Sequence, residues 1–244
     1  MNGMDSWSPG ELLDCQQTSM LIPDMTLIVA LPGTDTCVLC ADSLGLLTNY
    51  ARRDNCDKLW KIGRDCAVGF SGRGDVAHGI VREMGWINRD SYVDVIRAGG
   101  ELADKFRAYC QPEDRRDIAM SAMLAGFSQG IPFAVRIEKP GGYPTAIDEA
   151  ALSIGITQWA DGILNKHFPK SRDQRKTRTL DLLGILCVLA TSRYSYGVGG
   201  AVQLLNVSDD GVRPLEKDIL DDYVERVSNT IGELETKTAT LLQS

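Results

Sequence analysis

Residues 26–43, with the sequence TLIVALPGTDTCVLCADS, carry the clearest secondary-structure signal in this chain. It holds two apolar, β-prone runs, Thr26–Leu31 and Thr36–Asp42, and the residues between them, Pro-Gly-Thr-Asp, are typical of a turn. Two such runs joined by a short turn predict a β-hairpin. Regular structure is therefore expected to begin at Thr26, and the polar, aperiodic residues 1–25 are expected to form an extension outside the fold.

Strand-like and helix-like segments alternate in blocks after this hairpin. We expect Asp90 or Ser91 to cap the second predicted helix. Blocks of strands between pairs of helices predict an α+β fold in which two sheets pack together with helices outside, although other α+β folds share this periodicity. Strands are predicted at 59–62, 66–71, 117–127, 132–138, 150–154, 199–207 and 212–215, and helices at 75–87, 92–110, 158–168, 179–192 and from 216 onward.

The bulk composition argues against several classes of function. The chain has 244 residues, of which 43% are hydrophobic and 24% charged, as in an ordinary globular protein. Its net charge of −7 argues against a general nucleic-acid partner, which needs a basic surface. No run approaches the roughly 20 apolar residues of a membrane span, and the N-terminus lacks the pattern of a secretory signal. We therefore expect neither a membrane nor a nucleic-acid partner.

Seven cysteines are scattered through apolar segments, and this odd number does not indicate a disulfide framework. Reduced cysteines in a cytoplasmic protein are the simpler interpretation. Cys37 and Cys40 have the C-x-x-C spacing of metal and redox sites, but an odd offset in a strand places them on opposite faces. No second cysteine pair or nearby histidine completes a zinc site, so neither a metal nor another cofactor is expected.

Three short segments near the N-terminus carry a recognisable pattern. They are residues 26–43, the sequence DNCDKLWKI at 54–62, and the sequence AVGFSGRGD at 67–75. They resemble the opening hairpin, the catalytic-lysine segment and the oxyanion-glycine segment of proteasome β-subunit-type peptidases. These peptidases belong to the N-terminal-nucleophile hydrolase superfamily, which includes bacterial proteasome-related ring peptidases.

This resemblance implies a four-layer αββα sandwich of two antiparallel sheets flanked by helices, formed by a single domain over residues 26–244. It is specific over Thr26–Asp75 and looser as far as residue 215. Because its relatives build closed rings, it also implies self-association into a homo-oligomeric ring that acts on peptides or unfolded proteins. An ATPase unfoldase is then a candidate partner.

Amide hydrolysis needs a nucleophile, a base and hydrogen-bond donors for the developing oxyanion. The resemblance assigns the nucleophile to Thr26, whose own α-amine, with an ordinary pKa of about 7.7–8.0, would accept the hydroxyl proton once residues 1–25 are removed. Lys58 would lie beside the hydroxyl, Asp42 would hold Lys58, and the Gly72 N–H would bind the oxyanion. Each residue alone has an ordinary structural explanation. The shared 16-residue intervals, from Thr26 to Asp42 and from Asp42 to Lys58, match the family and favour a site.

The end of the chain departs from the family pattern. The family places an aspartate and a serine after its long buried helix, near the nucleophile. Here no Asp or Glu occurs between Asp181 and Asp209, so that carboxylate is missing. Ser195 stands at or near the place of the serine, and it is the candidate for orienting the α-amine.

The residues before Thr26 also depart from the pattern, because Met25 stands where relatives usually carry glycine. Residues 1–24 are either a real extension, removed or retained, or an over-extended start. In the second case removal of Met25 would expose Thr26 without a propeptide. We favour this second explanation.

Three functions compete for this pattern. The first is a threonine-type peptidase with Thr26 as its nucleophile and Phe70 lining an apolar substrate pocket. The second is a catalytically inactive ring or scaffold subunit, which the missing carboxylate and the N-terminal extension favour. The third is a small-amide hydrolase on the same framework, because a fold does not fix a substrate.

Overall fold

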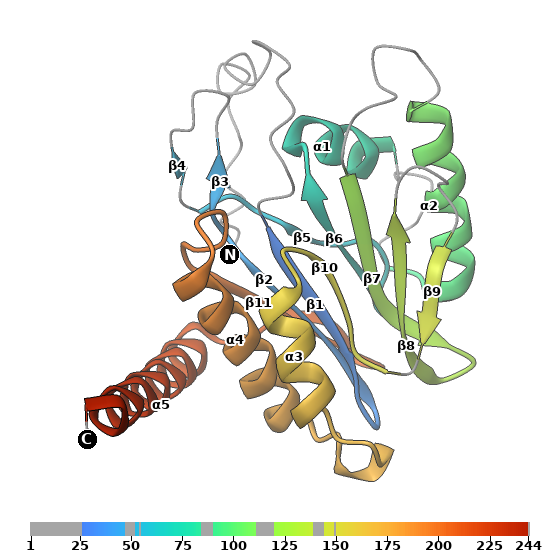
Figure 1. Cartoon of the computed structure of the whole chain (residues 1–244). Helices are drawn as coiled ribbons and strands as arrows, with labels where there is room; N and C mark the ends of the chain where they lie inside the picture. The colour runs from blue at the N-terminus through green and yellow to red at the C-terminus, as the bar shows by residue number, and fades with distance from the viewer. Residues whose placement is uncertain are drawn as a thin grey trace.

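A computed structural model of the protein describes residues 26–46, 52–53, 55–83, 90–110, 120–138, 144–148 and 150–243. Two five-stranded antiparallel sheets face each other, and helices cover the outer face of each (Figure 1). The architecture is therefore the four-layer α+β sandwich that the sequence predicts.

The first sheet has the order β10-β1-β2-β11-β12, and the predicted hairpin lies at its centre. Its strands are β1 (Leu27–Pro32), β2 (Thr36–Asp42), β10 (Leu152–Gly155), β11 (Val202–Ser208) and β12 (Gly211–Pro214). In β1, Leu27, Val29 and Leu31 face the helices, whereas Ile28 and Ala30 face the second sheet. The strand is apolar throughout because both of its faces are buried.

The second sheet has the order β5-β6-β7-β8-β9. Its strands are β5 (Leu59–Lys61), β6 (Cys66–Gly72), β7 (Met120–Ser128), β8 (Ile131–Glu138) and β9 (Pro144–Asp148). A small separate sheet joins β3 (Gly45–Leu46) to β4 (Arg52–Arg53). The two large sheets bury Ile28, Leu39, Met123 and their neighbours between them, and this shared core fixes how the sheets face each other.

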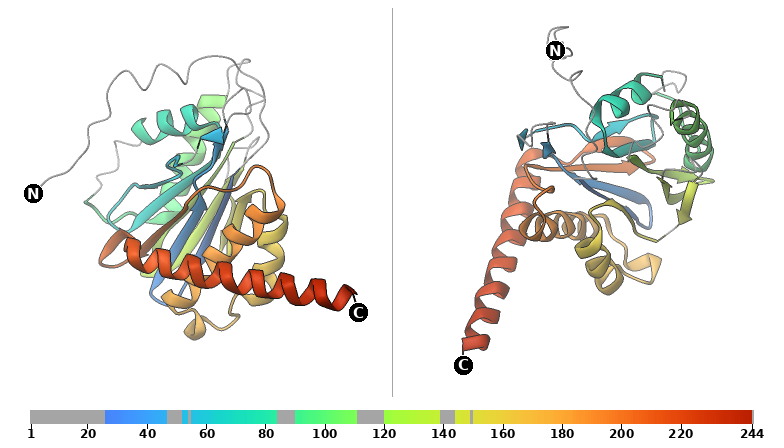
Figure 2. Two further views of the ribbon diagram at one scale, coloured as in Figure 1. Left: turned by 90° about the vertical axis from the view of Figure 1, so that its left-hand side faces the viewer. Right: turned by 45° about the horizontal axis from the view of Figure 1, so that its top comes forward.

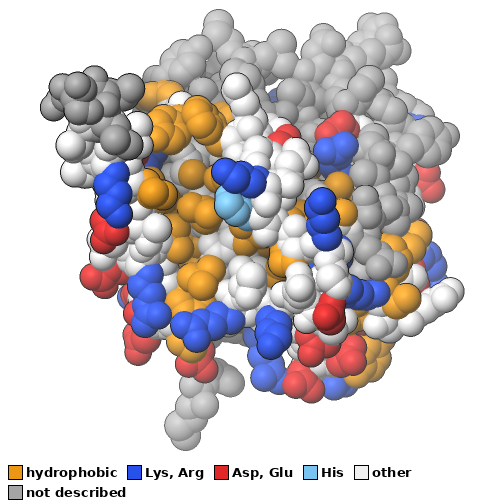
Figure 3. Space-filling view, turned by 60° about the horizontal axis from the view of Figure 1, so that its bottom comes forward, with side chains coloured by type: hydrophobic (Ala, Val, Ile, Leu, Met, Phe, Trp, Pro, Cys, Tyr) orange, Lys and Arg blue, Asp and Glu red, His pale blue; other side chains and the backbone are white. Residues whose placement is uncertain are grey.

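Among the described residues, two α-helices pack against the second sheet and three pack against the first. The elements are α1 (Gly74–Glu83), α2 (Val95–Cys110), α3 (Gln158–His167), η3 (Arg172–Gln174), α4 (Thr177–Tyr194) and α5 (Lys217–Gln243). The C-terminal end of α5 extends beyond the body of the molecule (Figure 2). The face at the bottom of Figure 1 carries basic and acidic side chains together with apolar ones (Figure 3).

Several local predictions are corrected by the structure. Helix α2 begins at Val95 because the Asp94 carboxylate accepts the Arg97 N–H at 2.9 Å, so Asp94 is the N-cap in place of Asp90 or Ser91. The sequence did not predict β3, β4 or β9. Residues 1–25, to which the sequence assigned an extension, lie outside the described part of the chain.

The structure also bears on the C-x-x-C pair. Cys40 packs against the helices that cover the first sheet, whereas Cys37 lies between the two sheets. Both thiols are free. The prediction that the two side chains lie on opposite faces is therefore confirmed.

Candidate active site

Thr26 directly precedes β1 and is almost completely buried, with 6% of its surface exposed. Its carbonyl accepts the Ile156 N–H at 2.9 Å, which ties this end of the first strand to the end of β10. A Cβ at Gly155 would lie 1.8 Å from the Thr26 carbonyl oxygen, and Gly155 has a φ of +87°. A glycine is needed there because both the close approach and the backbone conformation exclude a side chain.

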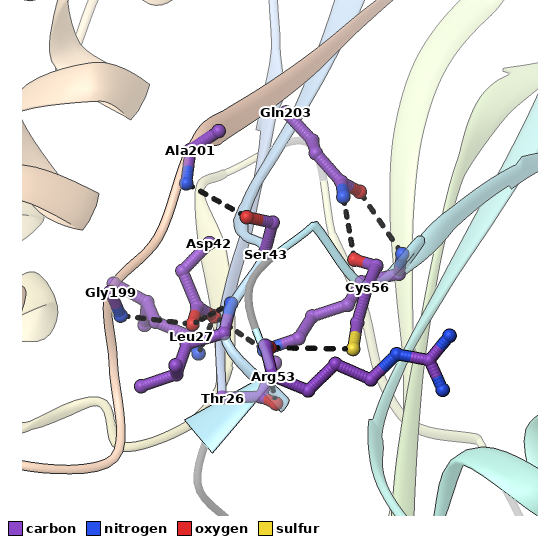
Figure 4. A network of polar contacts seen from close by, with 11 residues as sticks. Thr26, Leu27, Asp42, Ser43, Arg53, Cys56, Gly199, Ala201 and Gln203 are labelled. Atoms are coloured by element: carbon purple, nitrogen blue, oxygen red, sulfur yellow. Dashed lines mark hydrogen bonds and ion pairs between the residues drawn. The ribbon is translucent and has the colours of Figure 1, made fainter. Parts of the chain in front are cut away.

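Asp42 ends β2 and is fully buried. Its carboxylate accepts three backbone N–H groups, from Leu27 at 3.0 Å, Leu44 at 3.2 Å and Gly199 at 3.1 Å (Figure 4). A buried carboxylate needs such partners to offset the loss of water. The aspartate therefore has a fixed orientation before any cation is considered.

Lys58 completes a chain of three side chains. Its Nζ lies 2.9 Å from Asp42 Oδ1 and 2.8 Å from Thr26 Oγ1, and only 6% of the residue is exposed. Burial lowers the pKa of the Lys58 ammonium and raises the pKa of the Asp42 carboxyl, and the ion pair between them opposes both shifts. The structure thus joins three of the residues that the family resemblance assigned to the site.

The backbone around Lys58 is held by residues that sequence reasoning missed. The Lys58 N–H donates to Gln203 Oε1 at 3.0 Å, and Gln203 Nε2 donates to the Cys56 carbonyl at 2.7 Å (Figure 4). Ser43 accepts the Ala201 N–H on its Oγ at 2.8 Å, and its carbonyl accepts the Cys56 N–H, also at 2.8 Å. The sequence signal that could have pointed to these residues was Gln203, a polar residue in an otherwise apolar part of the strand predicted at 199–207.

Gly72, the predicted oxyanion donor, ends β6 and has a φ of +110°. The preceding Ser71 is fully buried and lies against Gly155, because its Oγ would be 3.0 Å from a Cβ placed there. Gly155 in turn adjoins the Thr26 carbonyl. Gly72 is therefore adjacent in sequence to Ser71, whose side chain packs at the end of the first sheet where Thr26 lies.

In the described part of the chain, neither the Phe70 side chain nor Ser195 takes part in this chain of side-chain contacts. The Phe70 side chain is 4% exposed and packs in the core between the second sheet and its helices, with ring centroids 5.6 Å from Trp60 and 6.0 Å from Phe106. Ser195 caps the C-terminus of α4, and in the described part of the chain it makes no hydrogen bond to Thr26. Its carbonyl accepts the Val198 N–H at 3.4 Å. The assigned roles of both residues remain predictions.

Neither a metal cluster nor a membrane helix is found within the described ranges. No group of three or more His, Cys, Asp or Glu side chains there is arranged to hold a metal ion. None of the helices there is both long and apolar enough to cross a membrane.

Comparison with known proteins places the chain in a family. No curated protein matches the sequence. A sequence model described as "Proteasome subunit" matches residues 25–195, which is more than two thirds of the 244 residues. The match includes Thr26, Asp42 and Lys58 and agrees with the two-sheet sandwich. The chain therefore belongs to the proteasome subunit family, and through it to the N-terminal-nucleophile hydrolases.

Proposed function

We propose that this chain is a threonine-type peptidase in which Thr26, once it is the first residue, is the nucleophile. The observation that carries the proposal is the position of Lys58 Nζ, at 2.8 Å from Thr26 Oγ1 and 2.9 Å from Asp42 Oδ1. A buried ammonium at this distance favours the alkoxide form of the hydroxyl, and it also disfavours a proton on a neighbouring amine. Family membership supports the same reaction class.

The proposed reaction has two stages. The Thr26 hydroxyl attacks the scissile carbonyl, and the Thr26 α-amine accepts the hydroxyl proton and passes it to the leaving amine. The N–H of Gly72 donates to the oxyanion, and Lys58, held by Asp42, stays a cation throughout. The first stage leaves an ester on Thr26. Water then attacks that ester, which releases the acid product and restores the hydroxyl.

The wider setting is proposed with it. We infer that copies of the chain form a homo-oligomeric ring in the cytoplasm, that its substrates are peptides or unfolded proteins, and that an ATPase unfoldase is a candidate partner. Phe70 belongs to the proposal as a residue that lines the substrate pocket, and Ser195 as the residue that orients the α-amine.

One observation favours a second function, an inactive ring subunit. No Asp or Glu lies between Asp181 and Asp209, where the family pattern has a carboxylate near the nucleophile. If residues 1–25 are retained, the nitrogen of Thr26 is an amide and cannot act as a base. The state of the N-terminus therefore separates the two functions.

The deciding experiment measures the intact mass of protein expressed from Met1 and, in parallel, from Met25. We expect at least one form to begin at Thr26, to cleave unfolded protein, and to be labelled on Thr26 by a threonine-reactive electrophile. Thr26→Ala is expected to lower cleavage at least about 1,000-fold. Thr238→Ala, at an exposed threonine of α5, is the matched control and should leave cleavage unchanged.

Other results would redirect the proposal. Protein that begins at Thr26 but neither cleaves nor reacts would favour the inactive subunit. Cleavage of small amides without cleavage of peptides would favour the small-amide hydrolase. Full activity in Thr26→Ala would end the proposal.

A further inference from the structure

The segment that leads into β11 lies beyond residue 195, where the family match ends. It nevertheless contacts both members of the buried ion pair. The Gly199 N–H donates to the Asp42 carboxylate at 3.1 Å, and the Gln203 side chain bonds to the backbone around Lys58. Val202 pairs with Asp42 in the strand register, so this register sets where Gln203 stands.

Lys58 itself lies outside the sheets. β5 begins one residue later, at Leu59, and Asn55 just upstream has a φ of +63°. Strand neighbours therefore do not supply every backbone partner of this segment. The Lys58 carbonyl accepts the Phe70 N–H at 3.2 Å, but its N–H and the Cys56 carbonyl are both paired by one side chain, that of Gln203.

A primary amide suits this task because it carries an acceptor and a donor in one rigid plane. Gln203 Oε1 accepts a hydrogen bond from the Lys58 N–H, and Gln203 Nε2 donates one to the carbonyl of Cys56, two residues before Lys58. The amide thus makes the two bonds that an adjacent strand would make. A carboxylate or an alkyl group of similar size cannot make both.

We propose that Gln203 is a positioning residue that fixes the Lys58 backbone so that Nζ reaches both Thr26 and Asp42. The inference rests on the proposed function, in which Lys58 acts on the Thr26 hydroxyl. The lysine side chain has four rotatable bonds. Nζ can keep its contacts at 2.8 and 2.9 Å only if the Lys58 backbone, from which the side chain extends, is held in place. Gln203 acts through Lys58 and does not touch the reacting atoms.

Gln203→Met removes both hydrogen bonds and keeps the length of the side chain. We expect kcat to fall by on the order of 10- to 100-fold, because small displacements of a catalytic group have costs of this size, whereas KM stays within about twofold. Gln203→Glu keeps the acceptor for Lys58, but when ionised it sets an oxygen against the Cys56 carbonyl. Its kcat relative to the parent protein is expected to recover as the pH falls and the carboxyl regains a donor.

Crystal structures of Gln203→Met and of a control variant provide a test that does not depend on activity. In Gln203→Met we expect Lys58 Nζ to leave hydrogen-bond distance of Thr26 Oγ1. The control is Gln174→Met, at an exposed glutamine of η3, which should keep both the Lys58 contacts and kcat. Unchanged Lys58 contacts and unchanged kcat in Gln203→Met would overturn the inference. A parent protein that begins at Thr26 but is inactive would end the proposed function, and the crystal distances would still decide the role of Gln203.

Discussion

Lys58 and Asp42 form an ion pair in which both charges are nearly removed from water, with side-chain exposures of 7% and 0%. Removing two charges from water costs several kcal/mol for each ion, and their attraction offsets this only where the geometry is good. Here Asp42 also accepts three backbone N–H groups, which helps to hold its charge. The pair therefore contributes a defined geometry more than net stability.

This balance predicts an asymmetry between single and double substitutions. Lys58→Met leaves the Asp42 charge buried without its cation, and it is expected to lower the free energy of unfolding by about 3–5 kcal/mol. Adding Asp42→Asn removes the orphaned charge and is expected to recover part of that loss. Urea unfolding of the parent, both single variants and the double variant measures the coupling between the two residues.

The exposed pair Arg226–Asp222 on α5 supplies the control, because its side chains are 59% and 46% exposed. Arg226→Met is expected to change the free energy of unfolding by less than about 1 kcal/mol. A similar loss in Arg226→Met and in Lys58→Met would show that burial of the pair has no special cost, contrary to this prediction.

The family resemblance could find Thr26, Asp42 and Lys58, because they lie within one short N-terminal region whose motifs and intervals match those of the family. Spacing could not find Gln203, whose partner Lys58 is 145 residues away. That contact depends on the pairing of β11 with β2, and a register of this kind cannot be determined from either strand alone.

At the scale of elements, α4 packs against β2 through a glycine. A Cβ at Gly184 would lie 3.0 Å from the Cβ of Cys40, which is tighter than ordinary van der Waals contact. Glycine inside a helix normally weakens it by roughly 0.5–1 kcal/mol relative to alanine. The close contact between helix and sheet is the reason for this glycine.

Two alanine substitutions separate these effects. Gly184→Ala is expected to lower the free energy of unfolding by about 1–3 kcal/mol, since the added methyl overpacks the helix against the sheet. Gly162→Ala in α3, where nothing lies within 4 Å of the added Cβ, is expected to raise it by roughly 0.5–1 kcal/mol. Thermal and urea unfolding of both variants measure the difference, and stabilisation by Gly184→Ala would contradict the packing argument.

Long, strongly patterned elements were predictable, and short or edge elements were not. The hairpin β1–β2 combines two apolar runs with a turn, so its sequence pattern is clear. β9 begins with Pro144 and follows a Pro-Gly-Gly sequence, which predicts a loop. Proline is tolerated there because, among the described strands, β9 lies at the sheet edge and pairs only with β8. β3 and β4 have two residues each, too few to show any period.

At the scale of the whole molecule, the packing of the two sheets assembles the candidate site. Thr26, Asp42 and Gln203 belong to the first sheet or its margin, whereas Lys58 directly precedes β5 of the second sheet and Gly72 ends β6. Hydrogen bonds from Lys58 therefore cross between the layers. The integrity of the site depends on the same sheet-to-sheet packing that stabilises the fold.

A buried acid outside the site makes this stability depend on pH. Asp181 lies on the inner face of α4 with 3% of its surface exposed. Burial raises its pKa from 3.8 to about 6, and a hydrogen bond from Asn206 opposes the shift. Between these two values the folded protein holds a proton that the unfolded chain has lost, so stability falls as the pH rises through this window. Above this window Asp181 is ionised in the folded protein, and its buried charge lowers the free energy of unfolding by roughly 3 kcal/mol.

Asp181→Asn replaces the acid with a neutral group of the same shape, and we expect the variant to be more stable than the parent at pH 8. At pH 4.5, where Asp181 is protonated in the folded protein, most of that advantage should disappear. Urea unfolding at both pH values measures it, and Asp221→Asn, at an exposed aspartate of α5, shows the effect of removing a carboxylate that is not buried. A stability difference for Asp181→Asn that does not change with pH would mean that Asp181 stays charged in the fold, and that polar contacts offset its burial.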